Sequence, residues 1–201
     1  EIIDGLNLKG FSLEDDFKKI AEDIKADLSL DYLASRGEFL NGKIMAEYLG
    51  YDFIDAKDVI FFNEEGHLNS YKTMKVLGQA LEEHPHAVIP GFYGCDKDGR
   101  VKTFSRGGSD VTGYIVAGAA KVDVYENWTD VSGFLICDPR IVKNPVGMQT
   151  ITYRELRELS YMGASVLHED AIFPVRSAGI PINIKNTNRP EDDGTWIVES
   201  T

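Results

Sequence analysis

Hydrophobic residues recur every three or four positions along much of the chain, which is the spacing of amphipathic helices. The first such series follows Ser12 and runs to Leu28, with acidic residues in its first turn. The second reaches Leu49 and stops at Gly50, a typical helix end. Helices are predicted in this way over residues 12–28, 31–49, 70–83, 109–120, 152–162 and 166–177.

Short apolar runs of strand length lie between these helices. They predict strands over residues 52–55, 59–62, 87–92, 101–104, 122–125, 134–137 and 180–184. Residues 95–100 have turn chemistry and are expected at the tip of a hairpin. Alternation of apolar strands with helices favours an α/β fold with a mostly parallel sheet. No repeat or linker interrupts the sequence, so we expect one domain over residues 1–201.

Composition and charge narrow the class of protein. The 201 residues are 43% hydrophobic, and 33 acidic against 21 basic residues give a net charge of −12. An acidic surface disfavours nucleic acid and anionic membranes, because binding to these depends on basic groups that neutralise phosphates. Cys95 and Cys137 have neither disulfide nor zinc-ligand spacing, and no apolar run is long enough to span a membrane. We therefore expect a cytoplasmic protein without nucleic-acid or membrane partners.

The first candidate site is a glycine-rich turn at Arg106-Gly107-Gly108-Ser109, which follows a predicted strand and opens a predicted helix. The first turn of a helix has free backbone N–H groups and the positive end of the helix dipole, so it attracts anions. Arg106 adds donors that suit a carboxylate or a phosphate, and Ser109 is both a helix cap and a hydroxyl donor. An ordinary capped helix with a solvated arginine explains the same pattern equally well.

A second candidate lies where the strand predicted at 122–125 ends. Thr129 and Asp130 follow that strand, and ligands of open α/β sheets bind at this edge. Asp130 could hold a ribose hydroxyl or a metal-bound water, and Arg140 could hold a phosphate. The alternative is that these residues form turns, since Asp-Pro at 138–139 commonly opens one.

A third candidate is Gly37-Glu38 inside the second predicted helix. A glycine in a helix interior costs about 1 kcal/mol relative to alanine, so a packing or ligand reason is expected. Glu38 could face an ammonium group, although a surface glutamate is the simpler reading. No G-x-S-x-G elbow supports a hydrolase nucleophile, and the histidines show no metal-ligand spacing.

Four segments resemble, in the same order, motifs of the aspartate kinases in the amino-acid kinase family. SRGEFLNGKIMAEYL is similar to the S-x-GE helix, and GFYGCDKDGRVKTFSRGGSDVTGYIVA to the specific GF-x-G…GRGGSD-x-T signature. VYENWTDVSGFLICDPRIV resembles WTDV-x-G…DPR, and residues 151–187 resemble the Y-x-E-x-x-E…GA-x-VLH…IP segment. Together they cover nearly the whole chain.

This resemblance implies a three-layer sandwich in which helices flank a mostly parallel central sheet. It implies phosphorylation of the side-chain carboxylate of L-aspartate by ATP, with Mg²⁺, in lysine, threonine and methionine biosynthesis. A homodimer is a further expectation. Residues 1–110 would mainly bind aspartate and residues 111–201 nucleotide. Another kinase of the same family, or a non-catalytic interaction or regulatory fragment, remains the alternative.

The resemblance also assigns roles to single positions. Glu38 would bind the α-ammonium group of aspartate and Arg106 its α-carboxylate. The rest of that site would be formed by Phe92, Gly107, Gly108 and Ser109. The nucleotide would be bound by Thr129, Asp130, Leu135, Arg140, Ser165 and Val166.

The sequence departs from the family pattern in several places. The family's K-F-G-G-[TS] loop, with its essential lysine, and its C-terminal ACT domains are not in the chain, so we expect a truncated domain with weak or no activity. Because that lysine is missing, no catalytic side chain is assigned. Ser165 replaces a usual lysine and Leu135 a usual tyrosine.

Overall fold

The computed structural model describes residues 1–26, 29–105, 107–138, 140–161 and 173–200. The chain divides into two compact units, Glu1–Thr112 and Gly113–Thr201. This division lies close to residue 110, where the resemblance separates an aspartate part from a nucleotide part. Which ligand each part binds stays a prediction.

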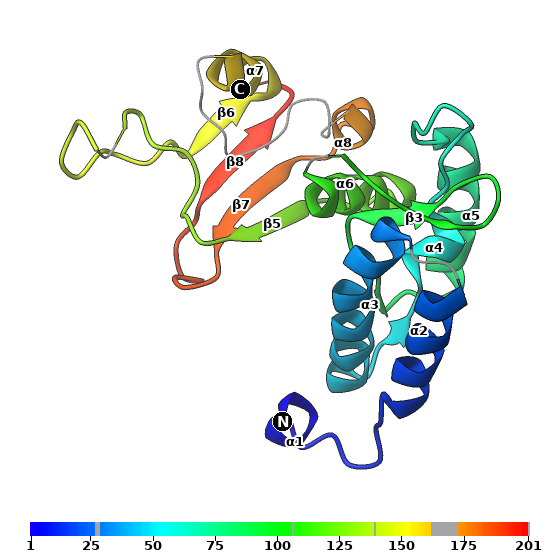
Figure 1. Ribbon diagram of the computed structural model, residues 1–201. Coiled ribbons are helices and arrows are strands. Elements are labelled where there is room, and N and C mark those ends of the chain that lie inside the picture. The colour runs from blue at the N-terminus through cyan, green and yellow to red at the C-terminus, as the bar shows by residue number, and fades with distance from the viewer. Residues whose placement is uncertain (27–28, 106, 139, 162–172, 201) are drawn as a thin grey trace. The chain divides into compact units, whose positions relative to one another are not determined.

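Helices dominate the first unit (Figure 1). They are α1 (Ile2–Gly5), α2 (Glu14–Ala26), α3 (Leu30–Leu49), α4 (Ala56–Val59) and α5 (Ser70–Glu83). The hydroxyl of Ser29 caps α3 by accepting from the Tyr32 N–H, and Gly50 ends that helix in a left-handed conformation. The helices predicted at 31–49 and 70–83 are confirmed within one residue, and α2 confirms the first series as far as Ala26.

The strands of the first unit are short. β1 (Asp52–Phe53) pairs in parallel with β2 (Ala87–Val88), and β3 (Tyr93–Cys95) forms the predicted hairpin with β4 (Val101–Thr103). The prediction of a strand over 59–62 is wrong at its start, because Asp55 caps α4 and Val59 lies in that helix. The strand predicted over 87–92 ends early: Pro90 has no N–H to pair, and Phe92 has a positive φ of 62°.

Helix α3 packs on both α2 and the strands of its unit. Its Lys43 bonds both carboxylate oxygens of Asp16 on α2 at 2.7 Å. On another face, Gly42 lies so close to Phe53 and Pro90 that a methyl group there would come within 3.0 Å of the Phe53 ring. These contacts fix α3 relative to the segment that leads into β3.

The second unit contains a four-stranded mixed sheet (Figure 1). Its spatial order is β5 (Tyr125–Thr129), β7 (Ile182–Asn186), β8 (Thr195–Val198) and β6 (Thr150–Thr152). The β5–β7 and β6–β8 pairs are parallel, and the β7–β8 pair is antiparallel. The accompanying helices are α6 (Gly108–Ala120), which begins in the first unit, α7 (Tyr153–Tyr161) and α8 (Phe173–Ser177). The α/β fold class is therefore confirmed.

Several strand predictions for this unit need correction. The first strand begins at Tyr125 rather than at 122, and residues 134–137 form no strand. Leu135 makes only an isolated bridge to Gly147 across a long loop. Strands β6 and β8 were not predicted, because each has at most four residues and depends on pairing with distant segments. Residues 166–172 of the last predicted helix lie outside the described residues.

The core of the second unit consists of aliphatic side chains from the sheet and its helices. Ile182, Ile184 and Ile197 are fully buried, as are Leu156 of α7 and Val175 of α8. Among the residues that the structure describes, no helix is long and apolar enough to cross a membrane.

Candidate functional site

The structure places the predicted site residues in two groups, one in each unit. The first unit contains Glu38, Phe92, Gly107, Gly108 and Ser109. The second unit contains Thr129, Asp130, Leu135 and Arg140. Arg106, Ser165 and Val166 were also predicted and lie outside the described residues.

The first group gathers where the loop before β3 meets the start of α6. Phe92 has a left-handed backbone with a φ of 62°, which is uncommon for any residue except glycine. Gly108 lies against it, and a methyl group on Gly108 would come within 2.6 Å of the Phe92 Cβ. A methyl group on Gly91 would similarly lie 3.1–3.3 Å from atoms of Ser109. Gly108 is thus required for the loop and the helix to approach this closely, and Gly91 avoids a tight contact with Ser109.

Thr112 joins these two segments and was not singled out from the sequence. Its hydroxyl accepts from the Phe92 N–H at 3.0 Å and donates to the Gly108 carbonyl at 2.8 Å. The residue is 3% exposed, so both bonds are shielded from water. Thr112 is four residues, or one helical turn, after Gly108. A threonine inside a helix often donates to the carbonyl one turn earlier, so its position could have indicated this bond.

The start of α6 has the features of an anion site. Gly107 has a φ of 54°, and its carbonyl accepts the N–H of Val111 in the first helical bond. The first N–H groups of any helix have no partner within it, and the helix dipole makes this end positive. Ser109 is exposed there. The geometry can therefore bind a carboxylate or phosphate through backbone groups.

Glu38 lies on the face of α3 that is turned toward the same loop. It is four residues before Gly42, which contacts Pro90, and seven after Asp31, whose carboxylate accepts from Thr103 of β4 at 2.7 Å. Residues at these spacings share one helix face. The Glu38 side chain is exposed. It is thus a carboxylate presented to solvent on the helix face whose other members contact Pro90 and β4.

Gly37 has no packing reason in the structure. It is exposed, and no described atom lies within 4 Å of where its Cβ would be.

Two members of the second group, Thr129 and Asp130, lie at the end of β5. Thr129 is its last residue, and the Thr129 carbonyl accepts from both the N–H and the hydroxyl of Thr187, at 2.8 and 3.0 Å. The Thr129 hydroxyl donates to Asp130 at 3.3 Å. The Asp130 carboxylate thus follows a parallel strand directly, as expected.

A lysine that the sequence did not single out lies next to this strand. Lys185 of β7 is paired with Trp128, and its ammonium group lies 5.5 Å from the centre of the Trp128 ring. It also donates to the Asp192 carbonyl at 2.8 Å. Lys185 places a positive charge beside the acidic end of β5, in a protein of net charge −12.

Arg140 and Leu135 lie on the long loop between β5 and β6. The Arg140 guanidinium bonds both oxygens of Asp138, at 2.6–3.0 Å, and hydrogen bonding to Arg140 lowers the pKa of Asp138. The Arg140 side chain is 88% exposed. Asp138 therefore occupies the groups predicted to bind phosphate. Leu135 is 42% exposed.

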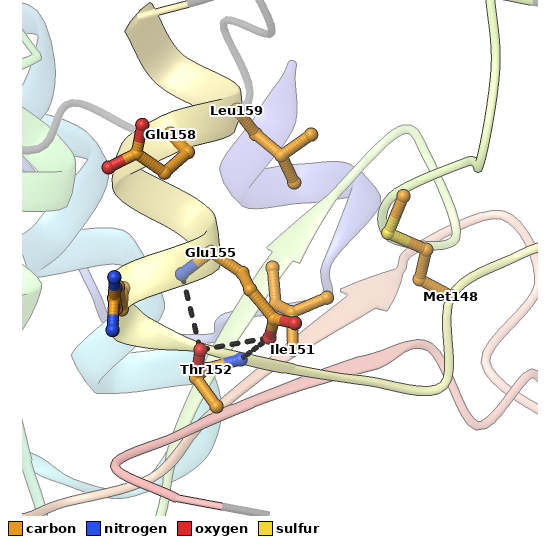
Figure 2. Close-up of a pocket in the computed structure, with 7 residues that line it drawn as sticks. Met148, Ile151, Thr152, Glu155, Glu158 and Leu159 are labelled. Carbon is orange, nitrogen blue, oxygen red and sulfur yellow. Dashed lines mark hydrogen bonds between the residues drawn. The ribbon is translucent and has the colours of Figure 1, made fainter.

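A pocket of about 540 Å³ opens beside α7 and contains none of the predicted site residues (Figure 2). It is lined by Met148, Ile151, Thr152, Arg154, Glu155, Glu158 and Leu159. The Glu155 carboxylate accepts from the N–H and the hydroxyl of Thr152, and these bonds lower the pKa of Glu155. This is a helix-capping box, so Glu155 has a structural role there.

No side chain in either group, as far as the structure describes them, is arranged as a nucleophile with a general base. In the described parts of the chain, no three His, Cys, Asp or Glu side chains come together to hold a metal ion. Cys95 and Cys137 are free thiols. Each group offers polar or charged atoms that can bind ions and polar ligands.

Comparison with known proteins gives a consistent result. The profile of the amino acid kinase family matches residues 1–186. Aspartokinase 3 of Bacillus subtilis is 42% identical over 177 residues, which are 84% of this chain and 39% of that protein. The crystal structure of Clostridium acetobutylicum aspartate kinase superposes with a TM-score of 0.94 at 55% identity, covering all of this chain and 46% of that one.

E. coli aspartokinase III, solved in complex with lysine and aspartate, superposes with a TM-score of 0.80 at 26% identity. That match covers 94% of this chain and 47% of the E. coli chain. The chain thus spans less than half the length of each of these relatives.

Proposed function

Because the chain belongs to the amino acid kinase family, we propose that it is part of an aspartate kinase. Its reaction transfers the γ-phosphoryl group of ATP to the side-chain carboxylate of L-aspartate and yields 4-phospho-L-aspartate. The observation that carries the proposal is the 55% identity to the Clostridium acetobutylicum enzyme over the whole chain, at a TM-score of 0.94.

The geometry of the first unit suits the amino-acid end of this substrate. An α-amino acid carries an ammonium and a carboxylate on one carbon atom. The exposed Glu38 carboxylate is the partner for the ammonium group, and the N–H groups at the start of α6 are the partners for the α-carboxylate. Arg106, which directly precedes Gly107 in the sequence, would also bind the α-carboxylate. The side-chain carboxylate of the substrate is left free to react.

The end of β5 suits the nucleotide. Thr129 and Asp130 offer a hydroxyl and a carboxylate for the ribose or for metal-bound water, and Lys185 offers a positive charge for phosphate. Release of Arg140 from Asp138 would add a second cation. We propose that Mg²⁺ arrives with ATP as part of the substrate and neutralises charge on the phosphates.

The transfer itself needs no nucleophile from the protein. An oxygen of the aspartate side chain attacks the γ-phosphorus, and the bond to the bridging oxygen breaks with its electron pair passing to ADP. The protein then contributes alignment of the two anions and neutralisation of their charge. This agrees with a site whose described residues offer anion-binding groups and no nucleophile–base pair.

An activity assay tests this proposal directly. The full-length protein that carries this chain is given Mg-ATP with L-aspartate, L-glutamate or UMP, and ADP release is coupled to NADH oxidation. We expect turnover with aspartate at least about tenfold above that with the other two acceptors. Turnover with glutamate or UMP alone would assign another kinase of the family. No turnover, with no heat on titration of either ligand, would support an interaction role.

Two finer expectations accompany the proposal. The family resemblance implies a homodimer and the cysteine content a cytoplasmic location, and both stay predictions. Sedimentation of the full-length protein tests the first.

A further inference from the structure

The interior of the first unit holds a buried arginine that the proposed reaction does not use. Arg36 is 8% exposed, on the turn of α3 that leads to Glu38. Its guanidinium carbon lies 4.4 Å from the centre of the Tyr32 ring, 4.6 Å from Phe39 and 5.5 Å from Tyr93. Among the described residues, no carboxylate forms an ion pair with it. A buried cation without such a pair is costly unless its surroundings hold it firmly.

Polar contacts complete the enclosure of Arg36. Its Nε donates to the Tyr32 carbonyl at 3.3 Å, and one terminal nitrogen donates to the Ser35 hydroxyl at 2.9 Å. Ser35 is fully buried and donates in turn to the Tyr32 carbonyl at 2.7 Å. The guanidinium is therefore fixed to its own helix on one side, and on the other side it contacts β3 through Tyr93.

Tyr93 connects Arg36 with the loop of the candidate site. It is fully buried, directly follows the left-handed Phe92, and its hydroxyl donates to Asp55 at 2.7 Å. Asp55 also accepts the N–H of Lys57 and so caps α4. Burial and the nearby Asp55 carboxylate raise the pKa of Tyr93, so the phenol stays protonated and remains a donor. Tyr93 is thus held from both sides.

Two contacts join α3 to the segment that contains this loop. Arg36 meets Tyr93, and Gly42 meets Pro90. Glu38 lies between the two helix residues, and Gly91–Phe92 lies between the two loop residues. These paired contacts fix the stretch of α3 backbone that carries Glu38 relative to the loop.

We propose that Arg36 is a positioning residue for the amino-acid substrate. By stacking on Tyr93 it holds the Glu38 turn of α3 at a fixed distance from Gly91–Phe92. The inference rests on the proposed function, because it concerns the same substrate site. A planar guanidinium suits this role better than an ammonium group, since it can stack on rings and donate in its own plane.

The test compares Arg36→Met with Lys43→Met in the full-length protein. Lys43 is a matched control: it lies on the same helix and its ammonium is 5.5 Å from the Phe39 ring, but its partner is Asp16 on α2. We expect Arg36→Met to raise KM for aspartate about tenfold or more, with KM for ATP within about twofold, because displacements of about 1 Å suffice for such losses. Lys43→Met should leave both values within about twofold.

Amide hydrogen exchange separates this inference from the proposed function. In Arg36→Met, exchange at Gly37–Glu38 and at Phe92–Tyr93 should accelerate at least about tenfold. In Lys43→Met it should not. These exchange rates test the positioning role whether or not the protein phosphorylates aspartate. Absence of aspartate phosphorylation in the unchanged protein would refute only the proposed function. Unchanged exchange in Arg36→Met, or an equal rise of both KM values, would overturn the inference. Arg36→Lys, which should give an intermediate KM for aspartate, replaces the methionine variant if that fails to fold.

Discussion

Phe92 adopts a backbone conformation that side chains other than glycine rarely enter, and its neighbours hold it there. Its N–H donates to Thr112, and its carbonyl accepts from the Phe104 N–H at 2.9 Å. Gly108 leaves the space that the Phe92 side chain needs. Such conformations cost about 1–3 kcal/mol and concentrate at functional sites. The strain therefore agrees with a binding role for this loop.

Replacing Gly108 by alanine should destabilise the protein. The new methyl group would lie 2.6 Å from the Phe92 Cβ and 2.8 Å from its Cα, so backbone has to move. Overpacking of this kind costs about 1–3 kcal/mol of unfolding free energy, measured by urea denaturation. Gly37→Ala is the matched control: no atom of the described residues lies within 4 Å of where the new Cβ would be, and alanine in a helix interior should stabilise by about 1 kcal/mol. A loss of the same size in both variants would contradict the packing argument.

Part of the candidate site could be predicted from single residues. The glycines at 107 and 108 indicate the start of a helix, and the structure begins α6 at Gly108. The prediction that Ser109 caps this helix is wrong, because the Gly107 carbonyl accepts the first helical bond and Ser109 lies inside the first turn. Thr112, Arg36 and Lys185 were missed, because their roles depend on segments that meet only after folding. Periodicity shows which face of a helix is buried but not which ring an arginine reaches.

At the level of elements, α7 is attached to the segment before β7 by one buried hydrogen bond. The Tyr153 hydroxyl donates to the Ile180 carbonyl at 2.6 Å, and Tyr153 is 2% exposed. Burial, with the nearby Glu199 carboxylate, raises the pKa of Tyr153 to about 12. The phenol must stay protonated to donate, so this contact resists alkali in the folded state.

Tyr153→Phe should therefore lower stability in a pH-dependent way. At pH 8 it removes the donor to a buried carbonyl, at a cost of about 1–2 kcal/mol. Because the folded pKa lies above the unfolded value of 10.0, the unchanged protein keeps this contribution below pH 10 and loses it as pH rises through about 12. The difference between the two proteins in urea unfolding should thus shrink from pH 8 to pH 11. Tyr161→Phe, on the same helix and 75% exposed, should change nothing. A difference independent of pH would contradict this account.

Helices were predicted far better than strands, for a physical reason. The sequence signal of an amphipathic helix lies in its local periodicity and in the residues at its ends. The predicted bounds of α3 and α5 accordingly agree with the structure to within one residue. The strands have two to five residues and are stabilised by partners distant in sequence. Residues 134–137 have the composition of a strand, yet they are not part of the sheet, whose strands are β5, β7, β8 and β6.

At the scale of the whole molecule, the negative net charge opposes the binding of anionic substrates. Aspartate and ATP are both anions, and the protein carries a net charge of −12. Attraction must come from local features, of which the structure offers the start of α6 and Lys185. These lie in different units, and so do the two groups of candidate site residues. We therefore propose that each unit binds one substrate, the first unit aspartate and the second ATP.

Kinetics of Glu38→Gln and Asp130→Asn in the full-length protein test this assignment most directly. Each change removes one charge with little change in shape. Glu38→Gln should raise KM for L-aspartate about tenfold or more and leave KM for ATP within about twofold, as expected for a charged partner lost from one ligand. Asp130→Asn should do the reverse. If both variants weaken the same substrate, or if either weakens both equally, the assignment of one substrate to each unit is wrong.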